Sequence, residues 1–207
     1  CTRSCGFCSV KTGKPLVADA MESIRTGHTV NAMNLRHVVI TSVDRDDIKN
    51  DYGAEIWAET IEQIRIQAPE CTIEVLTPDY RNYAPAFEKV FKAEPDIFSH
   101  NIECVERISR QVRPQSDWNR SLSVLQASIE WGLKTKTGMM VGLGENDSEV
   151  LETMQEIAEL GITIFNIGQY LQPTLNHLPV QRFVHPDIFK MYKERGLEMG
   201  FRVVESG

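Results

Sequence analysis

The sequence predicts an α/β fold, a partial (β/α)6-type TIM barrel, and two features support this prediction. Short β-branched runs alternate with segments of helical periodicity along all 207 residues, which is typical of repeated βα units around a parallel sheet. The expected strands end in polar, charged or glycine-rich tails, as the strands of a barrel do at its active-site face. An open doubly wound sheet is the alternative, but it concentrates function at one switch point. The length suits one domain, so we expect residues 1–207 to form a single core.

Six β-branched runs are the expected strands. The first, RHVVITSV, leads into DRDD, and the second, TIEVLTP, leads into DYR. The next three, DIFSHNIE, KTKTGMMVGLG and ITIFNIGQYL, end in HNIE, GLGE and QYLQP, and the last run is FRVVE. In order, these strands span residues 36–43, 72–78, 96–103, 134–144, 162–171 and 201–205.

The segments between these runs have the apolar spacing of amphipathic helices. Asp147 is placed to cap the fifth helix, and Pro186 suits the first turn of the sixth, where its missing N–H has no helical partner. Gly132, Gly161 and Gly200 occupy positions where glycine commonly ends a helix. The expected helices span residues 18–27, 54–67, 83–93, 118–132, 147–161 and 186–200.

The charge balance is acidic, with 22 Lys and Arg residues against 29 Asp and Glu residues and a formal net charge of -7. Nucleic acids and anionic membranes bind basic surfaces, so we expect neither as a partner. No apolar run approaches the roughly 20 residues of a membrane span, and no secretion signal opens the sequence. We therefore expect a cytoplasmic protein, or a protein of the organelle matrix in a eukaryote.

Three of the five cysteines crowd the first eight residues, in the motif CTRSCGFC. An odd number of cysteines with one tight group is typical of metal binding in a reducing compartment, and not of a disulfide framework. A structural zinc site uses four protein ligands. A [4Fe–4S] cluster held by three thiolates instead keeps one iron open for another molecule. The motif favours the cluster, and a zinc site completed by His37 or Cys71 is the alternative.

The spacing CxxxCxxC, with Phe7 just before the last cysteine, resembles the signature of the radical S-adenosylmethionine (SAM) superfamily. The resemblance implies that Cys1, Cys5 and Cys8 bind a [4Fe–4S] cluster whose open iron chelates the amino and carboxylate groups of SAM. In that superfamily, an electron from the cluster cleaves SAM into methionine and a 5′-deoxyadenosyl radical. The implied fold is the superfamily's partial TIM barrel, and we expect this chain to lack the first strand.

Further segments extend the resemblance over essentially the whole chain and narrow it to the lipoyl synthase family. Among radical SAM proteins, the string YLQP…HLPVQR is specific to that family. The implied activity is the insertion of two sulfur atoms at C6 and C8 of an octanoyl chain carried on a protein lysine, in lipoate biosynthesis. The matching segments are HVVITSVDRDD at 37–47, HNIECVERISRQVRP at 100–114, KTGMMVGLGE at 136–145 and IGQYLQPTLNHLPVQRFVHPDIF at 167–189.

The resemblance implies five polar contacts to SAM. Ser42 and Asp44 are expected at its methionine amino group, and Arg113 at its carboxylate. Asn101 and Glu103 are expected at its ribose. They alternate along an expected strand and so share one face, where a buried glutamate needs a ligand or a partner. Without the resemblance, Asp44 would be interpreted as part of a solvated helix start.

The resemblance also implies contacts to the nucleoside of SAM. Phe7 is expected to approach the adenine, and Gln169 and Leu171 to line the adenine side. Gly142 and Gly144 are expected to let the backbone approach the nucleoside closely. Alone, the GLGE segment around these glycines matches no complete phosphate-binding motif and is more typical of a turn.

The remaining candidate residues are expected to be structural. Cys71 and Cys104 stand alone in the sequence, as core cysteines usually do. Trp57, Trp118 and Trp131 follow helical patterns and are expected to pack in or at the rim of the core. None of the five histidines is expected to bind a metal.

Lipoyl synthases take sulfur from a second, auxiliary [4Fe–4S] cluster. Its ligands in the family are an N-terminal CxxxxCxxxxxC motif and a serine in a C-terminal RSSYHA-like motif, and this sequence contains neither. We therefore expect the chain to be the core of a longer protein and not to insert sulfur by itself. The implied partners are an octanoylated lipoyl-carrier domain, of 2-oxoacid dehydrogenase subunits or of the glycine cleavage H protein, and an electron donor such as ferredoxin or flavodoxin. The alternatives are another radical SAM reaction and a non-catalytic zinc-binding α/β module.

Overall fold

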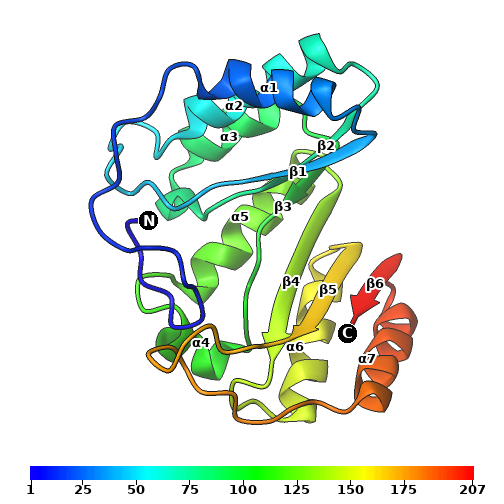
Figure 1. Ribbon diagram of the computed structural model, residues 1–207. Helices are drawn as coiled ribbons and strands as arrows, with labels where there is room; N and C mark the ends of the chain where they lie inside the picture. The colour runs from blue at the N-terminus through cyan, green and yellow to red at the C-terminus, as the bar shows by residue number, and fades with distance from the viewer.

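Six parallel strands follow one another across one sheet in chain order in the computed structural model, which describes residues 1–207. The edge strands, β1 and β6, do not pair with each other, so the sheet is open. A doubly wound sheet reverses its strand order at the switch point, whereas the wall of a barrel runs in sequence. Figure 1 shows this sheet curving around the N-terminal segment, which confirms the predicted partial barrel. The strands are β1 (His37–Thr41), β2 (Thr72–Leu76), β3 (Ile97–Ser99), β4 (Thr135–Val141), β5 (Ile164–Gln169) and β6 (Val203–Ser206).

Helices occupy the connections between the strands, and five of the six predicted helices begin and end within one or two residues of prediction. Gly132, Gly161 and Gly200 have positive φ and lie at or beside helix C-caps, and Pro186 opens the last helix, as expected. No helix combines the length and apolar character that a membrane span needs. The helices are α1 (Glu22–Ala32), α2 (Ala54–Gln67), the 3-10 helix η1 (Tyr80–Asn82), α3 (Ala84–Lys92), α4 (Glu106–Val112), α5 (Trp118–Glu130), α6 (Asp147–Glu159) and α7 (Pro186–Met199).

Two predictions about helix starts are wrong. The first helix begins at Glu22 and not at residue 18, because Asp19 makes a turn in which its carboxylate and carbonyl accept N–H groups of the next residues. The cap of α6 is Asn146 and not Asp147. The Asn146 side chain accepts the Glu149 N–H while the Glu149 carboxylate accepts the Asn146 N–H, which is a complete capping box.

The segment after β3 also differs from prediction. The expected strand at 96–103 is regular only at Ile97–Ser99, and α4 was not predicted. Glu103 has a φ of 69°, in the left-handed region that a continuing strand does not contain. It keeps a single parallel bridge to Met139 of β4. The regular strand thus ends at Ser99, the chain meets β4 once more at Glu103, and the turn there leads into α4.

The structure has two hydrophobic clusters, one for each half of the molecule, where a single core was expected. The first holds 15 buried residues, among them Ile73 and Phe98 of β2 and β3. The second holds 22 buried residues, among them Leu125 and Phe165 of α5 and β5. Fully burying such side chains stabilises the fold by about 1.5–3 kcal/mol each. Packing on these two clusters brings the carboxyl ends of the strands to one edge. Cys71, Trp57, Cys104 and Trp118 are buried in them, as expected, and Trp131 lies partly exposed against Phe91.

Candidate functional site

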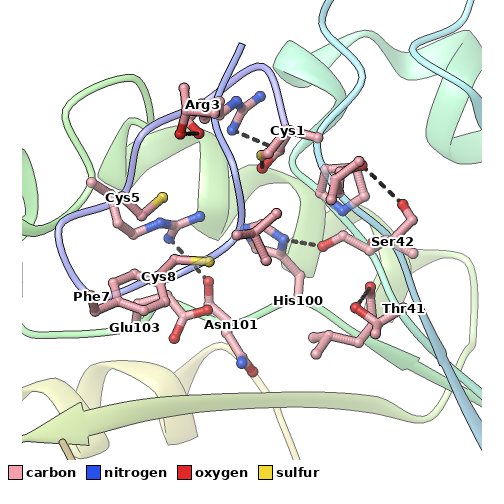
Figure 2. Close-up of a pocket in the computed structure, with 18 residues that line it drawn as sticks. Cys1, Arg3, Cys5, Phe7, Cys8, Thr41, Ser42, His100, Asn101 and Glu103 are labelled. Carbon is pink, nitrogen blue, oxygen red and sulfur yellow. Dashed lines mark hydrogen bonds and ion pairs between the residues drawn. The ribbon is translucent and has the colours of Figure 1, made fainter. Parts of the chain in front are cut away.

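The N-terminal loop and the carboxyl ends of β1, β2 and β3 enclose a cavity of about 450 Å³. Cys1, Cys5 and Cys8 all line it as free, half-buried cysteines, and Phe7 lines it beside them. Figure 2 shows the three thiols around the same space as the side chains that follow β3. A [4Fe–4S] cluster binds each of its thiolates at a separate iron, and three thiols lining one cavity are a donor set that fits it.

Before any metal binds, burial of the cysteine loop disfavours the thiolate form of Cys5. Burial raises the pKa of the Cys5 thiol to about 11, and the nearby Arg113 guanidinium only partly opposes this effect. The thiol is therefore protonated at neutral pH and releases its proton when a metal takes its place. Metal binding at this loop is expected to be favoured by higher pH for that reason.

Arg3, between the first two cysteines, fixes the loop to the ends of β1 and β2. Its guanidinium donates to both carboxylate oxygens of Asp46 at 2.9 and 3.0 Å and to Asp79 at 2.5 Å, and it lies 3.3 Å from Asp44. Arg3 is only 3% exposed. Burial disfavours the charged form of Asp46, but hydrogen bonds from Arg3 and Arg81 outweigh burial and lower its pKa. The sequence does not predict this cluster of charges, and its one local signal is the arginine inside the cysteine motif.

The structure brings the five predicted polar contacts together in the cavity. Asp44 is close to the first thiol, and the Cys1 Sγ lies 3.7 Å from its carboxylate. Burial raises the pKa of Asp44, with Arg3 acting in the opposite direction. Ser42 is exposed and its hydroxyl donates to the carbonyl of Val43. The cavity wall therefore carries one carboxylate held by Arg3 and one exposed hydroxyl whose only hydrogen bond is to the neighbouring carbonyl.

Glu103 presents its carboxyl group to the cavity from a turn and not from a strand. Its N–H donates to the Gly138 carbonyl, and its carbonyl accepts from Met140, so β4 fixes its backbone. Burial raises the pKa of Glu103, while Arg113 and the Asn101 side chain oppose the shift. Glu103 has no ion-pair partner, so its oxygens are available to hydroxyl donors of a ligand.

Arg113 supports the turn that carries Asn101 and Glu103. Its buried Nη1 donates to the carbonyls of Asn101 and Ile102 at 3.1 and 3.3 Å and to the Ser121 hydroxyl at 3.4 Å. Its Nε and Nη2 make no hydrogen bond within the chain. Because Arg113 also lines the cavity, these groups are the donors available to a bound carboxylate.

His100, which sequence reasoning treated as structural, also lines the cavity. Its Nδ1 lies 2.8 Å from the Thr77 carbonyl and its Nε2 lies 2.9 Å from the Ser121 hydroxyl. A carbonyl only accepts, so Nδ1 carries the hydrogen and Nε2 accepts from Ser121. Burial, together with Arg113, lowers the pKa of His100 to about 4. The ring is therefore neutral at physiological pH.

Four residues at or after the ends of β4 and β5 were predicted to contact the nucleoside, and none of them lines this cavity. They are Gly142, Gly144, Gln169 and Leu171. Gln169 uses its amide within the chain: Nε2 donates to the carbonyls of Val141, Tyr170 and Arg182, and Oε1 accepts from the Val184 N–H at 2.8 Å. The structure thus gives Gln169 the role of holding the segment after β5. A contact between Gln169 and adenine stays a prediction.

Gly142 is required by the chain's own packing. A Cβ at this position would lie 2.4 Å from Nε2 of Gln169 and 2.6 Å from the Arg182 carbonyl, and its φ is 99°. Gly144 has a φ of 115° and lies outside the cavity, and Leu171 is 68% exposed. The predicted approach of Gly142, Gly144 and Leu171 to a nucleoside also stays a prediction.

Comparison with known proteins defines the class to which this fold and site belong. Residues 1–157 match the family model described as the radical SAM superfamily. The whole chain matches a crystal structure of SuiB from Streptococcus suis bound to S-adenosylmethionine, with a TM-score of 0.78, 12% identity and 48% of that chain covered. At this identity, the likeness shows the fold alone. The chain is a radical SAM protein, and its cofactors are a [4Fe–4S] cluster and SAM.

Within this class, the sequence relatives identify the family. The chain is 47% identical to the lipoyl synthase of Flavobacterium johnsoniae over 208 residues, covering 100% of this chain and 72% of that protein. It is 51% identical to the lipoyl synthase of Rubrobacter xylanophilus over 209 residues, covering 100% of this chain and 65% of that protein. The mitochondrial lipoyl synthase of Nematostella vectensis is 45% identical over 208 residues, with 100% and 71% covered. The chain belongs to the lipoyl synthase family, a family of radical SAM sulfurtransferases, which decides against a zinc-binding module and against a different radical SAM reaction.

Proposed function

We propose that Cys1, Cys5 and Cys8 hold the [4Fe–4S] cluster and that SAM binds in the cavity beside them. The observation that carries this proposal is that one cavity is lined by all three thiols and by carboxyl, amide and guanidinium groups. The cluster and SAM, when bound, supply a 5′-deoxyadenosyl radical, which removes hydrogen from carbons that have no acidic proton.

The polar groups of the cavity match the functional groups of SAM. Asp44 offers a negative charge to the methionine ammonium, and Arg113 offers its unused N–H groups to the methionine carboxylate. Glu103, with Asn101 beside it, offers acceptors to the two ribose hydroxyls. Phe7 offers an aromatic face to the adenine. These residues hold and orient SAM, which is the protein's contribution when a cofactor performs the difficult chemistry.

We propose an octanoyl-lysine of a lipoyl-carrier domain as the substrate, on the support of the relatives' names. C6 and C8 of octanoyl are methylene and methyl carbons without an acidic proton, so each needs a radical to remove a hydrogen atom. Each SAM supplies one radical, so two SAM molecules are consumed per product. The carrier domain belongs to 2-oxoacid dehydrogenase subunits or to the glycine cleavage H protein. A ferredoxin or flavodoxin supplies the electrons, and the reaction takes place in the cytoplasm or in an organelle matrix.

The sulfur atoms come from an auxiliary [4Fe–4S] cluster that the five cysteines of this chain do not bind. Three of these cysteines line the cavity, and the other two, Cys71 and Cys104, are buried in separate hydrophobic clusters. Buried and separate thiols of this kind cannot surround a second cluster. We therefore propose that ligands outside these 207 residues bind it.

Anaerobic reconstitution with iron and sulfide tests the assignment of the cysteines. We expect about four irons per chain, and loss of iron binding when Cys1, Cys5 and Cys8 are all replaced by alanine. The matched control is the double variant Cys71→Ala/Cys104→Ala, which is expected to keep its iron. Equal iron in the triple variant and the wild-type chain, or uptake of one zinc in place of iron, would refute the assignment.

A further inference from the structure

The segment that follows β5 lies across the cysteine loop. Figure 1 shows residues 170–184 passing beside the N-terminal segment, far from it in sequence. The Leu178 N–H donates to the Gly6 carbonyl at 2.9 Å, and Nε2 of His177 lies 3.1 Å from the carbonyl of Cys8. Two consecutive residues of this segment therefore contact the second half of the loop.

Local hydrogen bonds shape the segment at this point, because it contains no helix or strand. The buried Tyr170 donates its hydroxyl to the Leu178 carbonyl at 2.7 Å. The side-chain amide of Gln172 donates to the His177 carbonyl at 3.0 Å. The carbonyls of residues 177 and 178 are thus held by side chains of the same segment, which fixes the part of the segment that contacts the cysteine loop.

The hydrogen bonds of His177 fix its ring in one tautomer. The Cys8 carbonyl only accepts, so Nε2 carries the hydrogen. Nδ1 lies 2.8 Å from the Thr174 hydroxyl and accepts from it. That hydroxyl in turn accepts the Asn176 N–H at 3.3 Å. The hydrogen bonds thus run in one direction, from the Asn176 N–H through Thr174 and His177 to the carbonyl of Cys8, the last cysteine of the motif.

Cys8 has few other backbone anchors. Its N–H donates to the Cys5 carbonyl, which lies within the same loop. After Cys8 the chain is irregular and mostly exposed to residue 20, and its hydrogen bonds near Cys8, made by residues 11–13, return to Cys1 and Arg3 of the same loop. By contrast, the first half of the loop is fixed by Arg3 and by the Thr2 N–H, which donates to the Asp44 carbonyl at 3.1 Å. The hydrogen bond from His177 is therefore the one that joins the Cys8 backbone to the rest of the fold.

We propose that His177, oriented by Thr174, is a positioning residue that sets the place of Cys8 in the loop. The inference rests on the proposed role of the three cysteines as cluster ligands. Removing the hydrogen bond leaves Cys8 tethered only through its own loop, so the third thiolate is held less firmly and iron leaves the loop more easily.

Gly6, which has no side chain, allows the close contact between the cysteine loop and the segment after β5. A Cβ at Gly6 would lie 2.8 Å from Cγ and Cδ1 of Leu178, so the loop and the segment touch without space for a side chain. The Gly6 N–H also donates to the Val112 carbonyl at the end of α4. The Gly6–Leu178 contact does not involve the His177 side chain, so it keeps residue 177 beside Cys8 when the imidazole is replaced. A substitution of His177 therefore tests its hydrogen bond to Cys8 and not the packing of the segment on the loop.

Matched substitutions separate the hydrogen bond from the bulk of the ring. His177→Phe keeps a ring of similar size without a donor, and His177→Gln keeps an N–H at about the position of Nε2. Thr174→Val removes the hydroxyl that orients the ring, and Thr174→Ser retains it. His28→Phe, on the exposed face of α1, is the control for adding a surface aromatic.

Two measurements on the wild-type chain and these variants test the proposal. We expect His177→Phe and Thr174→Val to speed amide hydrogen exchange in residues 1–13, and to speed iron loss to a chelator about three- to tenfold. His177→Gln, Thr174→Ser and His28→Phe are expected to match the wild-type chain, with melting temperatures unchanged throughout. Equal exchange and iron loss in His177→Phe and the wild-type chain, or equal effects of His177→Phe and His177→Gln, would overturn the proposal. Failure of the wild-type chain to bind iron would refute the cysteine assignment, and the exchange measurement would still decide the role of His177.

Discussion

Arg3 shows how much of the site depends on one side chain. It carries a positive charge into the interior, where Asp46, Asp79 and Asp44 surround it. Buried ions of this kind are acceptable only when each is paired and hydrogen-bonded. Without Arg3, the remaining cations would be Arg81 at Asp46 and the more distant Arg120 at Asp79. The acidic ends of β1 and β2 therefore require the arginine that lies inside the cysteine motif.

Replacing Arg3 by glutamine is expected to lower the free energy of unfolding by about 3–5 kcal/mol. The measurement is urea denaturation of the apo chain. Arg25→Gln is the control, because Arg25 forms an exposed ion pair with Asp19 and is expected to leave the denaturation midpoint unchanged. Similar midpoints for the Arg3 and Arg25 variants would show that the buried carboxylates do not need Arg3.

His100 is expected to make stability depend on pH. The pKa of its imidazole is 6.5 before folding and about 4 in the folded chain, where burial and Arg113 disfavour the charged form. Between these values the unfolded chain binds more protons, so the contribution of His100 is complete above pH 6.5 and is lost as the pH falls toward 4. The contribution is at most about 3 kcal/mol.

The variant His100→Asn tests this dependence, because its amide N–H can still reach the Thr77 carbonyl. We expect the free energy of unfolding of the variant to fall less steeply between pH 6.5 and 4 than that of the wild-type chain. His28→Asn, at an exposed position, serves as the control. Parallel curves for His100→Asn and the wild-type chain would contradict the account.

At the level of residues, the sequence predicted the three thiols, Phe7 and five polar groups of the cavity, but not Arg3, His100 or how the groups are held. The polar residues after β1 and β3 share the cavity because the carboxyl ends of parallel strands meet at one edge, and Arg3 holds the cysteine loop at that edge. Arg3 and its partners Asp46 and Asp79 are 43 and 76 residues apart in sequence. No local pattern links residues so distant, so their pairing could not be predicted from one sequence.

At the level of elements, α6 depends on its capping box. Asn146 and Glu149 satisfy each other's backbone N–H groups at the start of the helix. We expect Asn146→Ala to lower the free energy of unfolding by about 1 kcal/mol. Asn119→Ala, at an exposed position in the first turn of α5, is the control and is expected to have little effect. Equal denaturation midpoints for the two variants would mean that the box does not stabilise the helix.

The sequence predicts helices and strands well where their periodic pattern is long, and poorly where a single turn determines where an element ends. The helices α2, α3, α5, α6 and α7 have several turns of amphipathic spacing. The path of the segment after β3 depends instead on a single turn at Glu103, whose positive φ only glycine adopts without cost. Neither composition nor periodicity signals that turn, so β3 was predicted too long and α4 was missed.

At the level of the whole molecule, the cysteine loop connects the two halves of the fold. Arg3 bonds to the ends of β1 and β2, beside the cluster of 15 buried residues. Gly6 bonds to the end of α4 and to Leu178, beside the cluster of 22. The cavity lies where these two attachments meet. Motion of either half relative to the other therefore changes the positions of the three thiols.

The central claim is that the thiols hold a cluster with one iron open to SAM in this cavity. Electron paramagnetic resonance of the reconstituted, dithionite-reduced chain tests it most directly, with and without saturating SAM. The account predicts a reduced-cluster spectrum that changes when SAM is added, because SAM coordinates the open iron. An identical spectrum in the presence of SAM, from a chain that holds its iron through Cys1, Cys5 and Cys8, would contradict the claim.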